Sequence, residues 1–98
     1  MALTSEEKEQ MTNRLLYFLS WHPADGMTIR QLQEQVGEEL SKPQITELLE
    51  TSPYVYKTGV RPEGPINNPA HVWELRRYGQ GTPEAKELKR RVMLGSRN

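Results

Sequence analysis

Three segments of the chain begin with the same local pattern, and this repetition restricts the possible folds more than any other feature. In each segment a hydroxyl residue stands three positions before a Glu or Gln: Thr4 and Glu7, Thr28 and Gln31, and Ser41 and Gln44. At the start of a helix each of the two side chains can accept a hydrogen bond from the other residue's backbone N–H. Apolar residues follow at helical spacing, so the sequence predicts three helices, over residues 5–20, 28–36 and 42–51.

Proline and glycine mark the breaks between these predicted helices. Pro23 cannot continue the first helix, and Gly37 can end the second in the left-handed conformation. Pro53 disfavours a helical conformation for the residue before it and so ends the third. The connection between the second and third helices is therefore short, which is typical of a helix-turn-helix.

The residue types change after Pro53. Residues 54–59 are rich in aromatic and β-branched side chains, and residues 71–76 alternate polar and apolar side chains, so two strands are predicted. The glycines, prolines and asparagines between them favour neither helix nor regular strand. We therefore expect a long, irregular hairpin loop.

A fourth helix is predicted near the end of the sequence. Thr82 can cap it and Pro83 suits its first position, so the predicted helix covers residues 83–94. We divide the chain into a domain of residues 1–79 and a basic C-terminal helix and tail of residues 80–98.

These elements predict a mainly α-helical fold with a small antiparallel β-hairpin. Their order over residues 5–77 resembles that of the winged helix-turn-helix superfamily, which has a three-helix core and a hairpin, the wing; here a C-terminal helix follows. In such a fold the apolar faces of the three helices and one side of the hairpin form the interior. The predicted core consists of Leu15, Leu19, Ile29, Leu32, Val36, Ile45, Leu48, Leu49, Val55, Trp73 and Leu75.

The resemblance also implies roles for two segments. In winged-helix proteins that bind DNA, the third helix usually enters the major groove and the wing touches phosphates or the minor groove, which would assign these roles to residues 41–51 and 57–71. Residues 68–75, Asn-Pro-Ala-His-Val-Trp-Glu-Leu, resemble the passage from wing to strand in Z-DNA-binding domains. The third helix departs from that pattern at three positions where those domains use asparagine, arginine and tyrosine: Thr46, Glu47 and Glu50.

Composition argues against an enzyme. The chain has no cysteine, which excludes thiolate metal ligands and thiol catalysis, and its two histidines, His22 and His71, have no metal-ligand spacing around them. We expect neither a metal nor another cofactor. No apolar run approaches the roughly 18 residues that cross a bilayer, and the first residues lack the order of a signal peptide. We therefore expect a cytoplasmic protein without a membrane partner.

Charge is distributed unevenly although the formal net charge is zero. Residues 1–52 carry nine acidic and four basic side chains, and residues 53–98 carry four acidic and nine basic ones. The two halves could simply attract each other, or the basic half could bind nucleic acid. The predicted DNA-binding residues are Lys42, Gln44, Thr46, Lys57, Arg61, Asn67, Asn68, His71, Arg76 and Arg77. A basic cluster on the last helix comprises Lys86, Lys89, Arg90 and Arg91.

Two functions follow from these patterns. The basic wing favours a small regulator of transcription or of another DNA transaction that binds double-stranded DNA. Zero net charge and the glutamates of the third helix instead favour a winged-helix module that binds or inhibits a protein partner without binding DNA. The last helix also has an apolar side, which suggests a homodimer through that helix. That side consists of Leu88, Val92, Met93 and Leu94.

Overall fold

The computed structural model describes residues 3–22 and 25–96 of the chain. This part contains four α-helices, one short 3-10 helix and a three-stranded antiparallel sheet. The elements are α1 (Ser5–Ser20), β1 (Met27–Thr28), α2 (Ile29–Val36), the 3-10 helix η1 (Gly37–Glu39), α3 (Lys42–Thr51), β2 (Val55–Glu63), β3 (Asn68–Leu75) and α4 (Pro83–Gly95). All four predicted helices are confirmed, and their ends agree within one residue.

The helix starts follow from the hydroxyl residues that cap them. Thr4, Thr28 and Ser41 each accept a hydrogen bond from the backbone N–H three residues later, and the Glu or Gln at that later position accepts one in return. Thr82 accepts a bond from the N–H of Ala85 and starts α4. These bonds satisfy backbone donors that have no partner inside the helix.

The sheet is larger than the sequence predicts. Its strand order is β1-β3-β2, so β3 lies in the centre, and the two-residue strand β1 pairs with Val72 and Trp73. The prediction of a two-stranded hairpin with a long loop is therefore wrong. The strands β2 and β3 continue almost to the tip of the hairpin and leave only residues 64–67 as a turn.

Two prolines explain why the longer strands were not predicted. Pro62 lies directly opposite Pro69, so the two residues that lack an N–H share one cross-strand position. Pro69 also lies beyond the residues that β1 pairs with, so no third strand requires its N–H. A shift of register at Thr58 further interrupts the alternation of side chains along β2.

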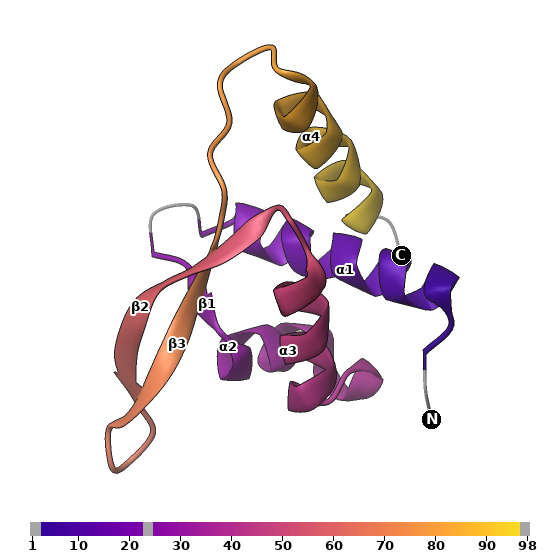
Figure 1. The fold of residues 1–98 in the computed structure, drawn as a ribbon. Helices are drawn as coiled ribbons and strands as arrows, with labels where there is room; N and C mark the ends of the chain where they lie inside the picture. Colours follow the sequence, from indigo (N-terminus) through magenta and orange to yellow (C-terminus); the bar gives the residue numbers. More distant parts are fainter. Residues whose placement is uncertain (1–2, 23–24, 97–98) are drawn as a thin grey trace.

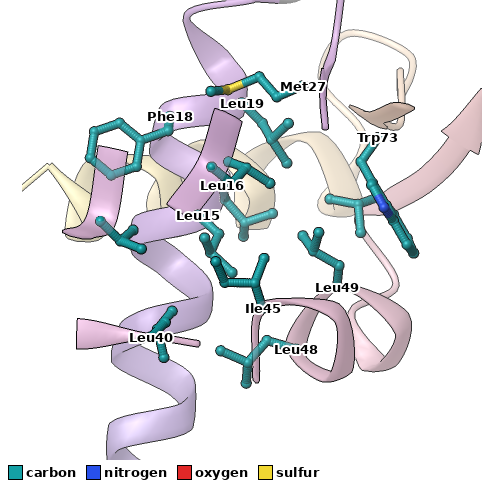
Figure 2. Close-up of a cluster of buried hydrophobic side chains, with 13 residues drawn as sticks. Leu15, Leu16, Phe18, Leu19, Met27, Leu40, Ile45, Leu48, Leu49 and Trp73 are labelled. Atoms are coloured by element: carbon teal, nitrogen blue, oxygen red, sulfur yellow. The ribbon is translucent and has the colours of Figure 1, made fainter. Parts of the chain in front are cut away.

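The core lies between α1, α2, α3 and the sheet (Figures 1 and 2). Nine of the eleven predicted core residues are buried, and the other two, Ile29 and Leu75, are partly buried against the core. Five buried apolar residues are outside the predicted core: Leu16, Phe18, Met27, Leu40 and Val72. Leu16 widens the buried face of α1 beyond a single stripe because this helix lies between α4 and the other helices (Figure 1).

The last helix packs on the first. Leu88 and Val92 of α4 are partly buried against the core, whereas Met93 and Leu94 are exposed. At Gly95 the helices approach so closely that an added Cβ would lie 1.9 Å from the carbonyl oxygen of Asn13. This arrangement of helices and sheet is compatible with a winged-helix layout.

Candidate binding groove

A groove of about 250 Å³ lies between α3 and the hairpin formed by β2 and β3. It collects side chains from α2, α3 and both hairpin strands. The lining residues are Ile29, Arg30, Lys42, Thr46, Glu50, Lys57, Glu63, Ala70, His71 and Trp73. Four of the predicted DNA-binding residues, Lys42, Thr46, Lys57 and His71, therefore share one site.

The α3 wall of the groove follows from helical spacing. Lys42, Thr46 and Glu50 are four residues apart in succession, so they lie on one face of α3. The Thr46 hydroxyl donates a 3.0 Å hydrogen bond to the carbonyl oxygen of Lys42, which fixes its orientation. Ile45 and Leu49 belong to the opposite, buried face and hold this wall against the core.

The hairpin wall is built around Trp73. This residue is only 4% exposed and is part of the core, while Lys57 lies opposite it on β2. The Lys57 ammonium is 5.4 Å from the centre of the Trp73 ring, within the range of a cation–π interaction. This contact places a positive charge on the hairpin wall of the groove.

Charges of both signs line the groove. Arg30, Lys42 and Lys57 supply three cations from three different elements, and Glu50 and Glu63 supply two carboxylates. Glu63 is already engaged, because it accepts a 2.5 Å hydrogen bond from the hydroxyl of the buried residue Thr28. The hydrogen bond does not remove the charge of Glu63, so three cations and two carboxylates give the groove one net positive charge.

Arg61 does not line the groove and is used within the fold. Its guanidinium donates a 3.2 Å bond to Oε1 of Gln31 and a 2.6 Å bond to the carbonyl oxygen of Asp25. It lines a separate hollow of about 220 Å³ beside these residues. Arg61 and Glu63 therefore both tie the hairpin to the start of α2.

The other predicted residues lie outside the groove. Gln44 accepts a bond from the N–H of Ser41 as part of the α3 cap. Asn67 and Asn68 lie at the hairpin tip, where Asn67 has a φ of 52° that completes the turn. The guanidinium of Arg76 is 5.2 Å from the Tyr56 ring centre, and Arg77 is exposed beyond β3.

The basic cluster of α4 does not contribute to the groove either. Arg90 and Arg91 both bind Glu87, at 2.6 and 3.0 Å. Arg91 also contacts Glu9 of α1 and lies 5.6 Å from the centre of the Tyr54 ring. Lys86 and Lys89 are exposed on the outer face of the helix.

Sequence reasoning missed Arg30 and Glu63. Arg30 is in the first turn of α2, and its guanidinium reaches the hairpin turn, since a Cβ added to Gly64 would lie 3.4 Å from it. Glu63 was assigned to a loop. Both belong to the groove only because the hairpin folds back onto α2, and no local pattern in the sequence indicates that contact.

Two hollows of greater volume, about 510 and 640 Å³, lie along α1. Despite their greater volume they are weaker candidates for the binding site, because neither is lined by residues of the hairpin strands. Within residues 3–22 and 25–96, no three His, Cys, Asp or Glu side chains are grouped so that they could hold a metal ion. No helix in the same part of the chain is long and apolar enough to cross a membrane. Comparison with known proteins finds no matching family model, curated protein or solved structure.

Proposed function

We propose that this chain is a winged-helix protein that binds double-stranded DNA in the groove between α3 and the hairpin. The observation that carries the proposal is the convergence of Arg30, Lys42 and Lys57, from three separate elements, on one groove beside the exposed face of α3. Phosphate contacts of this kind give affinity and fix the orientation of a protein on the duplex.

Each cation has a distinct means of support. Lys42 is in the first turn of α3, where the helix dipole also favours a phosphate. Lys57 is held over Trp73, and Arg30 forms a 3.7 Å ion pair with Glu34 while it reaches toward the hairpin turn. These three residues are the proposed phosphate contacts.

Base edges would be read by Thr46 and His71. Both line the groove, and the Thr46 oxygen can still accept a hydrogen bond after donating its proton to the backbone. Glu50 is the unfavourable member of the site, since a carboxylate repels phosphates, although it can accept a bond from a cytosine amino group. Replacing Glu50 with Gln should therefore strengthen non-specific binding and alter the preference among sequences.

A salt titration tests the proposal. Binding of a labelled duplex of random sequence is measured by fluorescence anisotropy across a range of salt concentrations. Lys42→Ala and Lys57→Ala should each weaken binding and reduce the slope of log affinity against log salt by about one unit. Arg77→Ala removes the same charge from an exposed position outside the groove and should leave the slope unchanged.

Two results would contradict the proposal. If Arg77→Ala reduces the slope as much as Lys42→Ala does, the DNA contact is not in the groove. If the wild type binds no duplex at low salt, where electrostatic attraction is strongest, the protein does not bind DNA in this way.

The second candidate function is capture of a protein partner through α3. Glu47 and Glu50 are both exposed on this helix, and Glu47 forms a 3.7 Å ion pair with Lys8. Such a surface suits a basic partner better than a phosphate backbone. Under this alternative, Glu47→Ala and Glu50→Ala weaken capture of the partner, and duplex DNA binds only weakly at physiological salt.

A further inference from the structure

We propose that two copies of this chain associate across a twofold axis through the outer face of α4 and the neighbouring acidic hollow on α1. This surface is separate from the groove proposed to bind DNA. Charges of opposite sign lie next to each other on this patch of the protein.

The first half of the patch is the outer face of α4. Helical periodicity places its members on one side, opposite Leu88 and Gly95, which pack inward. They are Lys86, Lys89, Arg90, Met93 and Leu94, and all are exposed. The face is therefore basic along most of its length and apolar at its C-terminal end, where Met93 is 58% exposed and Leu94 39% exposed.

The second half is the hollow of about 640 Å³ that Leu94 borders. Glu6 and Glu9 of α1 and Glu39 of η1 surround it, and Met11 contributes an apolar side chain. Arg14 also lines the hollow and lies 3.7 Å from Glu39. The hollow is acidic overall, with apolar groups where it meets α4.

Leu94 thus belongs to both halves of the patch, with positive charge along α4 on one flank and negative charge around the hollow on the other. A twofold interface brings the same patch of each copy together, so every contact occurs twice. An axis near Leu94 sets the basic face of each α4 against the acidic hollow of its partner. It also pairs the exposed apolar groups at the centre, which is the usual arrangement of a protein interface.

Contacts within one copy leave charges available for this pairing. Arg90 and Arg91 bind Glu87, and Arg91 also contacts Glu9. Lys86 and Lys89 make no ion pair with another described residue. The carboxylates of a second copy would pair with these two ammonium groups. Because the patch carries charges of both signs, a second copy complements it better than a partner that is acidic or apolar throughout.

The test uses two charge-reversed variants of the whole chain. The first, Glu6→Lys with Gln10→Lys, reverses the hollow, and the second, Lys86→Glu with Lys89→Glu, reverses α4. Both pairs of positions are exposed, and circular dichroism verifies that each variant folds. As a matched control for the second variant, Lys42→Glu with Lys57→Glu makes the same change of charge outside the patch.

Mass is measured by sedimentation from about 5 to about 300 µM, because self-association depends on concentration. The wild type and the control should dimerise, and each reversed variant alone should remain monomeric. An equimolar mixture of the two reversed variants should restore a dimer, since each basic surface then meets an acidic one. A wild type that is monomeric throughout, or a mixture that stays monomeric, overturns the proposal.

Discussion

The hydroxyl of Thr28 donates a 2.5 Å hydrogen bond to the carboxylate of Glu63, although 35 positions separate the two residues in the chain. Thr28 is fully buried, and its hydroxyl oxygen also accepts a bond from the N–H of Gln31 at the start of α2. One hydroxyl thus caps a helix and holds the end of the hairpin. The groove wall and α2 are therefore linked through a single side chain.

We expect Thr28→Val to lower the free energy of unfolding by about 1–3 kcal/mol, because it removes a helix cap and leaves Glu63 without its partner. Urea denaturation measures the change. Thr58→Val is the matched control, since the Thr58 hydroxyl makes only a 3.4 Å bond on an exposed strand, and it should change stability by less than about 0.5 kcal/mol. If the double variant loses as much free energy of unfolding as Glu63→Ala and Thr28→Val lose together, the two side chains are not coupled.

Gly95→Ala tests the close approach of α4 to α1. Helix propensity alone would stabilise the variant by about 0.5–1 kcal/mol. The added Cβ would collide with the carbonyl oxygen of Asn13, and overpacking of this kind costs about 1–3 kcal/mol or more. We therefore expect a net loss in thermal or urea denaturation.

Gly59→Ala is the control for Gly95→Ala, because a Cβ at Gly59 meets no atom within 4 Å. Its effect on stability should be within about 0.5 kcal/mol. A Gly95→Ala variant that is more stable than the wild type would show that the two helices are further apart than described.

Replacing each of the two tryptophans should have a different effect on the stability of the protein, and their fluorescence should also differ. Trp73 is 4% exposed and Trp21 is 57% exposed. Trp73→Ala should cost about 3–5 kcal/mol, and Trp21→Ala much less. In the Trp21→Phe variant, the remaining Trp73 should emit at short wavelength and resist quenching by acrylamide. Efficient quenching of Trp73 would contradict its place in the core.

Glu87 should titrate at lower pH than an ordinary glutamate. The hydrogen bond from the Arg90 side chain is the main cause that lowers its pKa below 4.5, and the charges of Arg90 and Arg91 lower it further. A carboxyl whose pKa is lowered by folding adds stability above its unfolded pKa, and this contribution is lost as the pH falls through the lowered value. Carbon NMR should find that Arg90→Gln raises the pKa of Glu87. An unchanged pKa would mean that the bond is absent in solution.

The helices were predictable because the information that defines them is local. Each cap lies within three residues of its partner, and each apolar stripe repeats along one segment. The ends of the sheet were not predictable in this way. Pro62 and Pro69 argue against strands when each is read alone, and their compatibility with a hairpin depends on their being opposite each other.

The candidate site was predictable only in part for the same reason. The positions of Lys42 and Thr46 follow from α3, and those of Lys57 and His71 follow from the two strands. Arg61 had the charge and the position of a phosphate contact in the sequence, but in the structure it bonds to Gln31 and Asp25. Such a long-range contact depends on how the hairpin meets α2, which no short pattern encodes.

The packing of α4 on α1 has a consequence for synthesis of the chain on the ribosome. Residues 5–20 emerge first, but the surface of α1 that meets Gly95 is covered only after residues 83–95 have left the exit tunnel. Until then, this side of α1 is open to chaperones and to other nascent chains. A pause in translation anywhere between α1 and the end of α4, the hairpin turn included, would prolong that exposure.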